Sequence, residues 1–281
     1  MSGAAAASRW RDIRRSALRS PTFLCGAAIV LFWVVCALFG PWLTPYDPLA
    51  DDVINSLTPP SPEHWFGSDQ LGRDVFSRVI AGARDILTVA PLATLLGTVA
   101  GTALGLASGY YGGVFDAIVG RIVDAFLALP LIVVSLLALV ALGSSNATVI
   151  FVIGLSFTPI IARTVRAAVL GERELDYVVA SHLRLESDAY VMFVEILPNV
   201  IAPVLVEATV RLGYAIFAVA TLSFLGFGIQ PPSPDWGLSI ASNYSLVANY
   251  CWTVLFDALA IASLVIGVNL LADGVENAVR D

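Results

Sequence analysis

The sequence predicts an all-α integral membrane protein with six transmembrane helices. Of its 281 residues, 58% are hydrophobic and only 13% are charged, and the mean hydropathy is +0.83. A soluble domain carries about 25% charged residues, so this chain has too much apolar surface to hide from water. Uncharged runs long enough to cross a bilayer, about 20 residues each, account for most of the chain and leave no room for a separate soluble domain.

The first crossing is expected over residues 23–43. It lies in an uncharged run from Ser20 to Tyr46 that follows five arginines, and this run is too long for the apolar core of a signal peptide. Because positive charge marks the cytoplasmic side, residues 1–22 are predicted to be a cytoplasmic N-terminal segment. Residues 44–85 are rich in proline, glycine and acids, and by alternation they form an external loop.

The next three crossings are expected over residues 86–115, 114–142 and 148–169. Gly112 and Gly113 end the first of these on the cytoplasmic side, and residues 143–146 form a short external turn between the other two. Small residues recur every four positions along the second helix, at Gly97, Gly101 and Gly105. This stripe predicts close packing against another helix, in this chain or in a partner subunit.

The last two crossings are expected over residues 198–220 and 252–271. Between helices four and five, the charged residues 170–197 lie in the cytoplasm, and residues 226–251 form an external loop in which Trp236 is suited to the membrane interface. An even number of crossings places both termini in the cytoplasm. The transmembrane domain is thus predicted to cover residues 23–273, with a cytoplasmic tail over residues 274–281.

Composition also excludes several kinds of site. The net charge of −7 disfavours nucleic acid as a partner, and the absence of lysine rules out a phosphate-binding lysine of an ATP site. The three cysteines lie in or beside apolar stretches, which indicates packing residues and no disulfide framework. His64 and His182 have no Cys or His neighbours at metal-ligand spacing, so neither a metal site nor a bound cofactor is expected.

Two pairs of opposite charges are predicted inside the membrane. Arg121 and Asp124 are three residues apart on helix three, and Glu207 and Arg211 are four apart on helix five, so each pair shares one helical face. Such charges either line or gate a pathway, or neutralise each other and support helix packing. Asp257 is the one unpaired acid that a proton-coupled carrier could use, and it is expected close enough to the external surface to be hydrated.

Six segments of the chain carry a family resemblance. Residues 176–188, followed by residues 193–199, resemble the EAA loop of ATP-binding-cassette importer permeases. Other segments are similar, in the same order, to the C-type subunits of the dipeptide, oligopeptide and nickel permease family: residues 67–78, 109–113, 121–130, 222–232 and 269–274. The resemblance implies a type I ABC importer permease fold in the inner, or cytoplasmic, membrane. It also implies a heterodimer with a homologous permease, two cytoplasmic ATPases that bind ATP and Mg, and an external substrate-binding protein.

The resemblance assigns the cytoplasmic loop to ATPase coupling. The coupling residues are Val178, Val179, Ala180, Ser181, His182, Leu183, Arg184, Leu185, Glu186, Ser187 and Asp188. Val178, Leu183 and Leu185 are expected to dock in an ATPase cleft, while Arg184, Glu186 and Asp188 pair around its rim.

The loop departs from the family pattern at three positions. Val179 replaces a glutamate, Leu185 replaces a glycine, and Glu195 stands where histidine is common. Glycine permits a left-handed turn that a branched side chain resists. The leucine therefore predicts either a differently built turn or weaker coupling to the ATPase.

The expected function is transport without chemistry on this chain. It would form half of a translocation pathway for dipeptides or oligopeptides, with ATP hydrolysis left to its partners. The external segments are expected to act as a lid or a docking surface for the binding protein, through Asp69, Arg73, Asp74, Arg78, Asp235 and Trp236. Nickel-chelate or haem uptake on the same scaffold, and a gradient-driven secondary carrier, are the alternatives.

Overall fold

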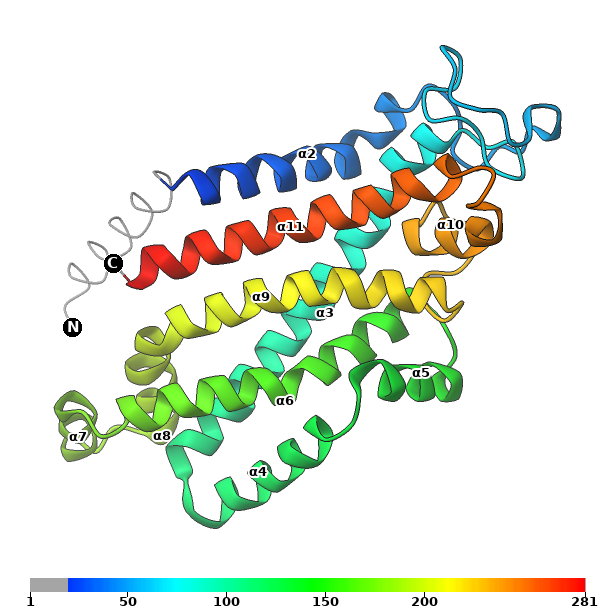
Figure 1. The fold of residues 1–281 in the computed structure, drawn as a ribbon. Helices are drawn as coiled ribbons and strands as arrows, with labels where there is room; N and C mark the ends of the chain where they lie inside the picture. The colour runs from blue at the N-terminus through cyan, green and yellow to red at the C-terminus, as the bar shows by residue number, and fades with distance from the viewer. Residues whose placement is uncertain (1–19, 281) are drawn as a thin grey trace.

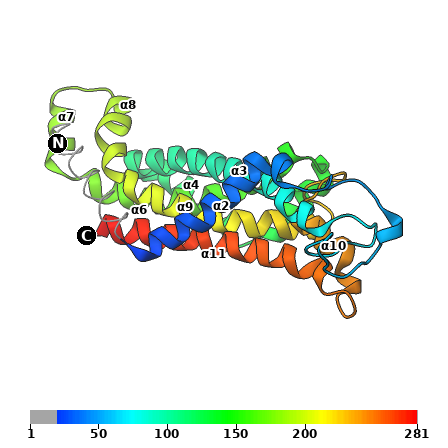
Figure 2. The same ribbon diagram turned by 90° about the horizontal axis from the view of Figure 1, so that it is seen from above.

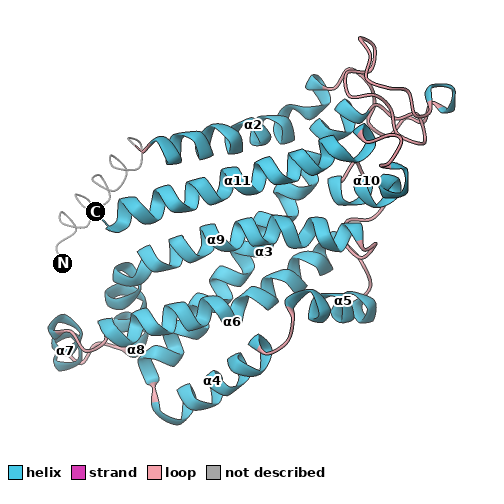
Figure 3. Ribbon diagram, in the orientation of Figure 1, coloured by secondary structure: helices cyan, strands magenta, loops and turns pink. Residues whose placement is uncertain are grey.

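The computed structural model describes residues 20–280, which are mainly helical (Figure 3). The arginine-rich segment expected in the cytoplasm lies outside the described residues, apart from its last three. The long helices are α2 (Pro21–Leu43), α3 (Val75–Tyr111), α4 (Gly113–Leu127), α5 (Leu131–Leu142), α6 (Asn146–Glu172), α9 (Leu197–Phe224) and α11 (Trp252–Arg280). The short helices are η1 (Val53–Asn55), α7 (Asp176–Leu183), α8 (Asp188–Tyr190), η2 (Val191–Ile196), α10 (Trp236–Asn243) and η3 (Tyr244–Leu246).

The helices confirm six candidate membrane crossings. Five are continuous and apolar enough to span a bilayer: residues 21–43, 75–111, 146–172, 188–224 and 252–278. The sixth is the pair α4 and α5, which pass the same test together but are bent by 89° at a short break. The predicted all-α membrane fold is therefore correct, although its third crossing is not one straight helix.

The long helices form a flattened bundle with two distinct ends. In Figure 1, α2, α11, α9 and α6 lie in sequence across the bundle, and α3 crosses behind them. The start of α2, the end of α11 and the projecting α7 and α8 lie together at one end, called here the α7 end (Figure 2). The loop after α2 and the helix α10 lie at the opposite end, called here the α10 end.

The glycine stripe of α3 packs against α6 of the same chain. A Cβ atom at Gly97 would lie 2.7 Å from the carbonyl oxygen of Gly154, and one at Gly105 would lie 2.5 Å from that of Ala162. Gly101 meets the same helix, and all three glycines are buried. Close helix packing is thus confirmed, and its partner is internal.

The helix α3 begins eleven residues earlier than expected. Its N-cap is Asp74, whose carboxylate accepts a hydrogen bond from the backbone N–H of Ser77 at 2.8 Å. The charges at Arg78, Arg84 and Asp85 had indicated a loop, but here they lie on a helix. The loop that was expected over residues 44–85 therefore shortens to residues 44–74.

The third crossing breaks at Pro130, which is the N-cap of α5. Proline has no N–H to donate and disfavours a helical conformation in the residue before it, so α4 ends at Leu127 and α5 starts in a new direction. The last two crossings run further than predicted, to Phe224 and Arg280. Neither extension changes the number of crossings.

Candidate functional site

The segment between α6 and α9 projects from the α7 end of the bundle (Figure 2). The helix α7 is followed by a tight turn, and α8 then continues through the π-helical turn η2 into α9. Leu183 and Leu185 point outward, with 80% and 91% of their surface exposed, and Val179 is 48% exposed. Val178 is fully buried, so the expectation that it docks in an ATPase is wrong: it packs inward in the core of this chain.

The turn between α7 and α8 keeps a left-handed backbone at the position of the family glycine. Leu185 has φ +58°, and its N–H donates to the carbonyl of His182 at 2.9 Å. The N–H of Glu186 donates to the carbonyl of Ser181 at 3.2 Å. The turn is therefore not built differently, and the leucine adopts the conformation that glycine tolerates best.

Arg184 organises the polar side of this projection. Its guanidinium lies 3.1 Å from the carboxylate of Glu195 and 3.6 Å from that of Glu186, and it donates to the hydroxyl of Ser181 at 2.9 Å. Arg184 and Glu186 pair with each other within this chain, whereas the expected pairing concerned the rim of an ATPase cleft. Glu195, at the position where histidine is common in the family, supplies the closer partner.

Further contacts brace the projection against three long helices. The Tyr177 hydroxyl donates to Glu172 at 2.8 Å and accepts from the Asn199 side chain at 3.1 Å. Burial and the hydrogen bond to Glu172 raise the pKa of Tyr177 above its usual value. The hydroxyl of Tyr110, on α3, donates to Asp188 at 2.9 Å, so Asp188 is tied to the bundle. The projection is therefore tied to α3, α6 and α9 by side-chain hydrogen bonds.

A second feature, called here the charged hollow, lies between α3, α4 and α6. Its volume is about 390 Å³, and its lining residues are Gly105, Ser108, Asp116, Ala117, Val119, Gly120, Arg121, Val123, Asp124, Ala162, Arg163 and Arg166. Asp116 pairs with the guanidinium of Arg166 and also accepts from the hydroxyl of Ser108. Charged groups from two crossings therefore meet inside this hollow.

The expected pair of Arg121 with Asp124 does not form. Asp124 instead pairs across to Arg163 of α6 at 2.7 Å, because α4 packs beside α6 at this level. Arg121 has no ion-pair or hydrogen-bond partner among the described residues. Charge spacing along one helix identified Arg121 and Asp124, but it could not identify a partner on a different helix, such as Arg163.

The expected pair on α9 does form. The guanidinium of Arg211 lies 2.7 Å from the carboxylate of Glu207, and both side chains are more than four-fifths buried. The Thr164 hydroxyl on α6 approaches Glu207 at 3.5 Å. This pair is internally neutral and joins α9 to α6, as the packing alternative requires.

The α10 end contains the residues expected to form the docking surface, and five of the six are buried. Asp69, Asp74 and Arg78 are at most 4% exposed, and Asp235 and Trp236 are fully buried. Only Arg73 is partly exposed, beside Asp51 at 2.6 Å. The prediction that these side chains themselves receive a binding protein is therefore wrong. Most of their polar atoms have partners inside the chain, as buried polar groups require, and the exception is one carboxylate oxygen of Asp235.

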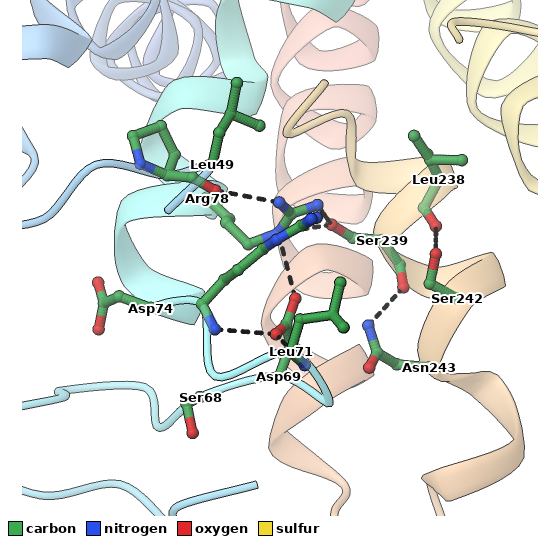
Figure 4. A network of polar contacts seen from close by, with 12 residues as sticks. Leu49, Ser68, Asp69, Leu71, Asp74, Arg78, Leu238, Ser239, Ser242 and Asn243 are labelled. Carbon is green, nitrogen blue, oxygen red and sulfur yellow. Dashed lines mark hydrogen bonds and ion pairs between the residues drawn. The ribbon is translucent and has the colours of Figure 1, made fainter. Parts of the chain in front are cut away.

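Arg78 is the centre of that buried network (Figure 4). Its guanidinium donates to the carbonyl of Pro48 at 3.1 Å and to the hydroxyl of Ser239 at 2.9 Å, and it lies 3.7 Å from the carboxylate of Asp69. These partners come from the loop of residues 44–74 and from α10. Asp257 on α11 is 2% exposed and interacts electrostatically with Arg78, so the expectation that it is hydrated is wrong.

Trp236 lies in the core, and not at the membrane interface as expected. Its indole N–H donates to the carbonyl of Val79 at 2.9 Å, and its ring meets Trp33 edge-on at 4.8 Å. The preceding residue, Asp235, caps α10 by accepting from the N–H of Leu238 at 2.9 Å. Burial raises the pKa of Asp235 to about 6, so this carboxyl takes up a proton at a higher pH than an exposed aspartate does but stays mostly ionised at neutral pH.

The remaining candidate groups show no metal or disulfide arrangement. Among the residues that the structure describes, no three His, Cys, Asp or Glu side chains are placed to hold a metal ion. His64 instead lies 2.9 Å from Asp74. The cysteines are all free, Cys36 in the core and Cys25 and Cys251 on the exposed surface.

Curated relatives match nearly the whole chain. A dipeptide transport system permease of Alkalihalophilus pseudofirmus is 36% identical over 97% of this chain and 90% of its own. A di/tripeptide permease of Pseudomonas aeruginosa is 37% identical over 91% and 86%. A glutathione permease of Salmonella typhimurium is 39% identical over 96% and 89%.

Comparisons of the fold and of the family agree with those relatives. The structure of the MetNI methionine ABC transporter in inward-facing conformations contains a chain with the same fold, with a TM-score of 0.57 and 19% identity over 72% of this chain and 95% of that chain. Residues 8–60 match the N-terminal transmembrane domain of oligopeptide transport permease C. Residues 101–281 match the family described as the binding-protein-dependent transport system inner membrane component. The chain belongs to this family of ABC transporter permeases.

Proposed function

We propose that this chain forms half of the translocation pathway of an ATP-driven peptide importer in the inner membrane. Support for peptide cargo comes from relatives named for dipeptides, di/tripeptides and glutathione. The chain passes its cargo without covalent change. Nickel-chelate or haem uptake is the alternative on the same scaffold, and a direct uptake assay separates the three.

The proposed partners are a homologous permease, two cytoplasmic ATPases and an extracytoplasmic binding protein. ATP and Mg belong to the ATPases. We take the α7 end as the cytoplasmic end. The start of α2 and the end of α11 lie at the same end of the bundle (Figure 1), which supports a cytoplasmic location for both termini. The exposed surface of the loop at residues 44–74 faces the binding protein, in place of the buried side chains first expected to do so.

One observation carries the proposal: the braced projection presents Leu183 and Leu185 to solvent at 80% and 91% exposure. Exposed leucines on a projection are suited to fill a pocket on a partner protein, since burying one leucine side chain contributes about 1.5–3 kcal/mol. The contacts of Arg184, Tyr177 and Asp188 hold the projection against α3, α6 and α9. Movement of an attached ATPase would thus move these helices.

The test is Leu183→Asp in the assembled transporter. A charge placed in an apolar contact should reduce ATPase recovery in mild detergent, and ATP-driven uptake of a labelled dipeptide into proteoliposomes, by at least about tenfold. The matched control is Ile54→Asp, which is 95% exposed at the α10 end and should leave ATPase recovery unchanged. Full ATPase recovery with Leu183→Asp would contradict the proposal. Uptake without ATPases, driven by an ion gradient, would favour the secondary-carrier alternative.

A further inference from the structure

The charged hollow exposes charges on helices that cross a membrane. The side chains of Arg163 and Asp124 are 64% and 55% exposed in this chain, and Arg121 is exposed beside them. Charges at such positions are too costly to face lipid, so they face protein or a water-filled path. The hollow is open and lined by polar groups, which makes it suited to hold water or a polar ligand.

The hollow has an excess of positive charge. Three arginines and two aspartates line it, and both aspartates are already paired with arginines of α6, Asp116 with Arg166 and Asp124 with Arg163. Arg121 is the remaining cation, with no ion-pair or hydrogen-bond partner among the described residues. A guanidinium without a carboxylate partner, in a hollow that already holds two ion pairs, is complementary to a ligand with one carboxylate.

We propose that Arg121 receives the free α-carboxylate of a peptide as it passes through the charged hollow. This inference rests on the proposed peptide-import function. Guanidinium binds a carboxylate through two parallel N–H···O bonds, a geometry that an amide cannot match. The volume of about 390 Å³ falls within the range of about 300–1,000 Å³ typical of small-molecule sites. Asp124, one helical turn along α4, is placed to meet the peptide ammonium group.

The location of Arg121 is suited to a site that a peptide occupies briefly on its way out toward the α7 end. It lies eight residues after Gly113, where α4 begins, which places it about 12 Å from the α7 end of that helix. A peptide released from this level would leave on the side of the α7 projection. The pairing of Asp124 with an exposed Arg163 costs little to open, because exposed ion pairs contribute about 0–1 kcal/mol.

The experiment compares a dipeptide with its C-terminal amide in proteoliposomes that contain the assembled transporter and one binding protein. Arg121→Gln should lower uptake of the free acid by about tenfold and leave uptake of the amide unchanged. Because the binding protein is the same for wild type and variant, its own preference cancels when the acid-to-amide ratios are compared. Arg121→Lys keeps the positive charge but loses the two parallel N–H donors of the guanidinium. Its ratio of acid uptake to amide uptake should therefore lie between those of the wild type and Arg121→Gln. Arg84→Gln, an exposed arginine near the opposite end of α3, is the control and should behave as wild type.

A second measurement locates the peptide directly. A dipeptide with a photoreactive side chain should label α4 during turnover in the wild type, and this labelling should fall in Arg121→Gln. Equal loss of acid and amide uptake would overturn the inference, because it would indicate a structural role or a bound lipid phosphate. If Arg121→Gln took up peptide normally, with an unchanged acid-to-amide ratio and no label on α4, the role of Arg121 would be overturned. The proposal of peptide import would still stand. Absence of dipeptide uptake by the wild type would overturn both proposals.

Discussion

At the residue scale, Leu185 is the most informative position. Its φ of +58° places a branched side chain in the left-handed region, which costs about 1–2 kcal/mol for a residue with a Cβ atom. Leu185 is also 91% exposed, so packing within this chain does not compensate for that cost. An outward-facing side chain kept in a strained turn indicates a role in contact with a partner.

Leu185→Gly should therefore stabilise the isolated permease. Relief of the left-handed strain exceeds the added entropy of glycine in the unfolded chain, so we expect a gain of about 0.5–1 kcal/mol in the free energy of unfolding. Thermal unfolding in detergent measures this change. Val179→Gly, in the helical part of α7, is the control of opposite sign and should destabilise by about 0.5 kcal/mol. A lower melting temperature for Leu185→Gly would contradict the strain argument.

The sequence located the segment that projects between α6 and α9 but not the direction in which each of its side chains points. Val178 and Val179 are adjacent and chemically identical, yet one is buried and the other is half exposed. Their difference depends on how α7 packs against η2, which residue type alone does not reveal. Asp69 was expected at the surface because isolated charges avoid burial. It is buried because Arg78 lies beside it as a counterion.

At the element scale, the seam between α3 and α6 is the most extensive contact of any two helices among the described residues. A Cβ atom at Gly101 would lie 2.7 Å from the Cβ of Ile161 and 2.9 Å from the carbonyl oxygen of Thr158. Backbone atoms cannot move aside as flexible side chains can, so a larger residue here must separate the two helices.

Gly101→Ala should lower the free energy of unfolding by about 1–3 kcal/mol, the usual cost of overpacking. The control is Gly171→Ala on α6, where an added Cβ atom meets nothing within 4 Å and the helix gains propensity. Both variants can be compared by fluorescence-detected thermal unfolding. Equal stability of the two would show that the seam adjusts to the extra carbon.

Hydropathy identified every crossing because the apolar runs are long, but it missed where several of them begin or break. The α3 start was misplaced because Arg78 and Asp85 were taken as loop residues, although the first is buried and the second accepts from Ser233. The break at Pro130 lies in an uninterrupted apolar stretch. Whether a proline breaks a membrane helix there depends on whether neighbouring helices satisfy the freed backbone groups. Hydropathy carries no information on that choice.

At the scale of the whole molecule, Arg78 joins three parts of the α10 end. It links α3 to the carbonyl of Pro48 and to Ser239 of α10, and Asp257 of α11 lies in its electrostatic field. The family resemblance predicted the fold and the transporter class. It could not predict this network, since the partners are separated by up to 161 positions along the chain.

Arg78→Gln should destabilise the α10 end by about 3–5 kcal/mol, because it leaves a buried carboxylate without its counterion. Limited proteolysis should then cut within residues 44–74 at least several times faster than in the wild type. Arg73→Gln provides the comparison in the same loop: its pair with Asp51 is partly exposed, so we expect a change of about 0–1 kcal/mol. Similar cleavage rates for both variants would exclude a central role for Arg78.

The glycine seam has a mechanical consequence for the two ends of the molecule. The 37 residues of α3 extend about 55 Å, and the helix is interlocked with α6 along much of this length, while α6 leads directly into the α7 projection. The two helices should tilt as a single stiff beam. A displacement of Leu183 at the α7 end would then move the first turn of α3 at the α10 end, together with the loop that Arg78 anchors. No rearrangement between α3 and α6 would be needed.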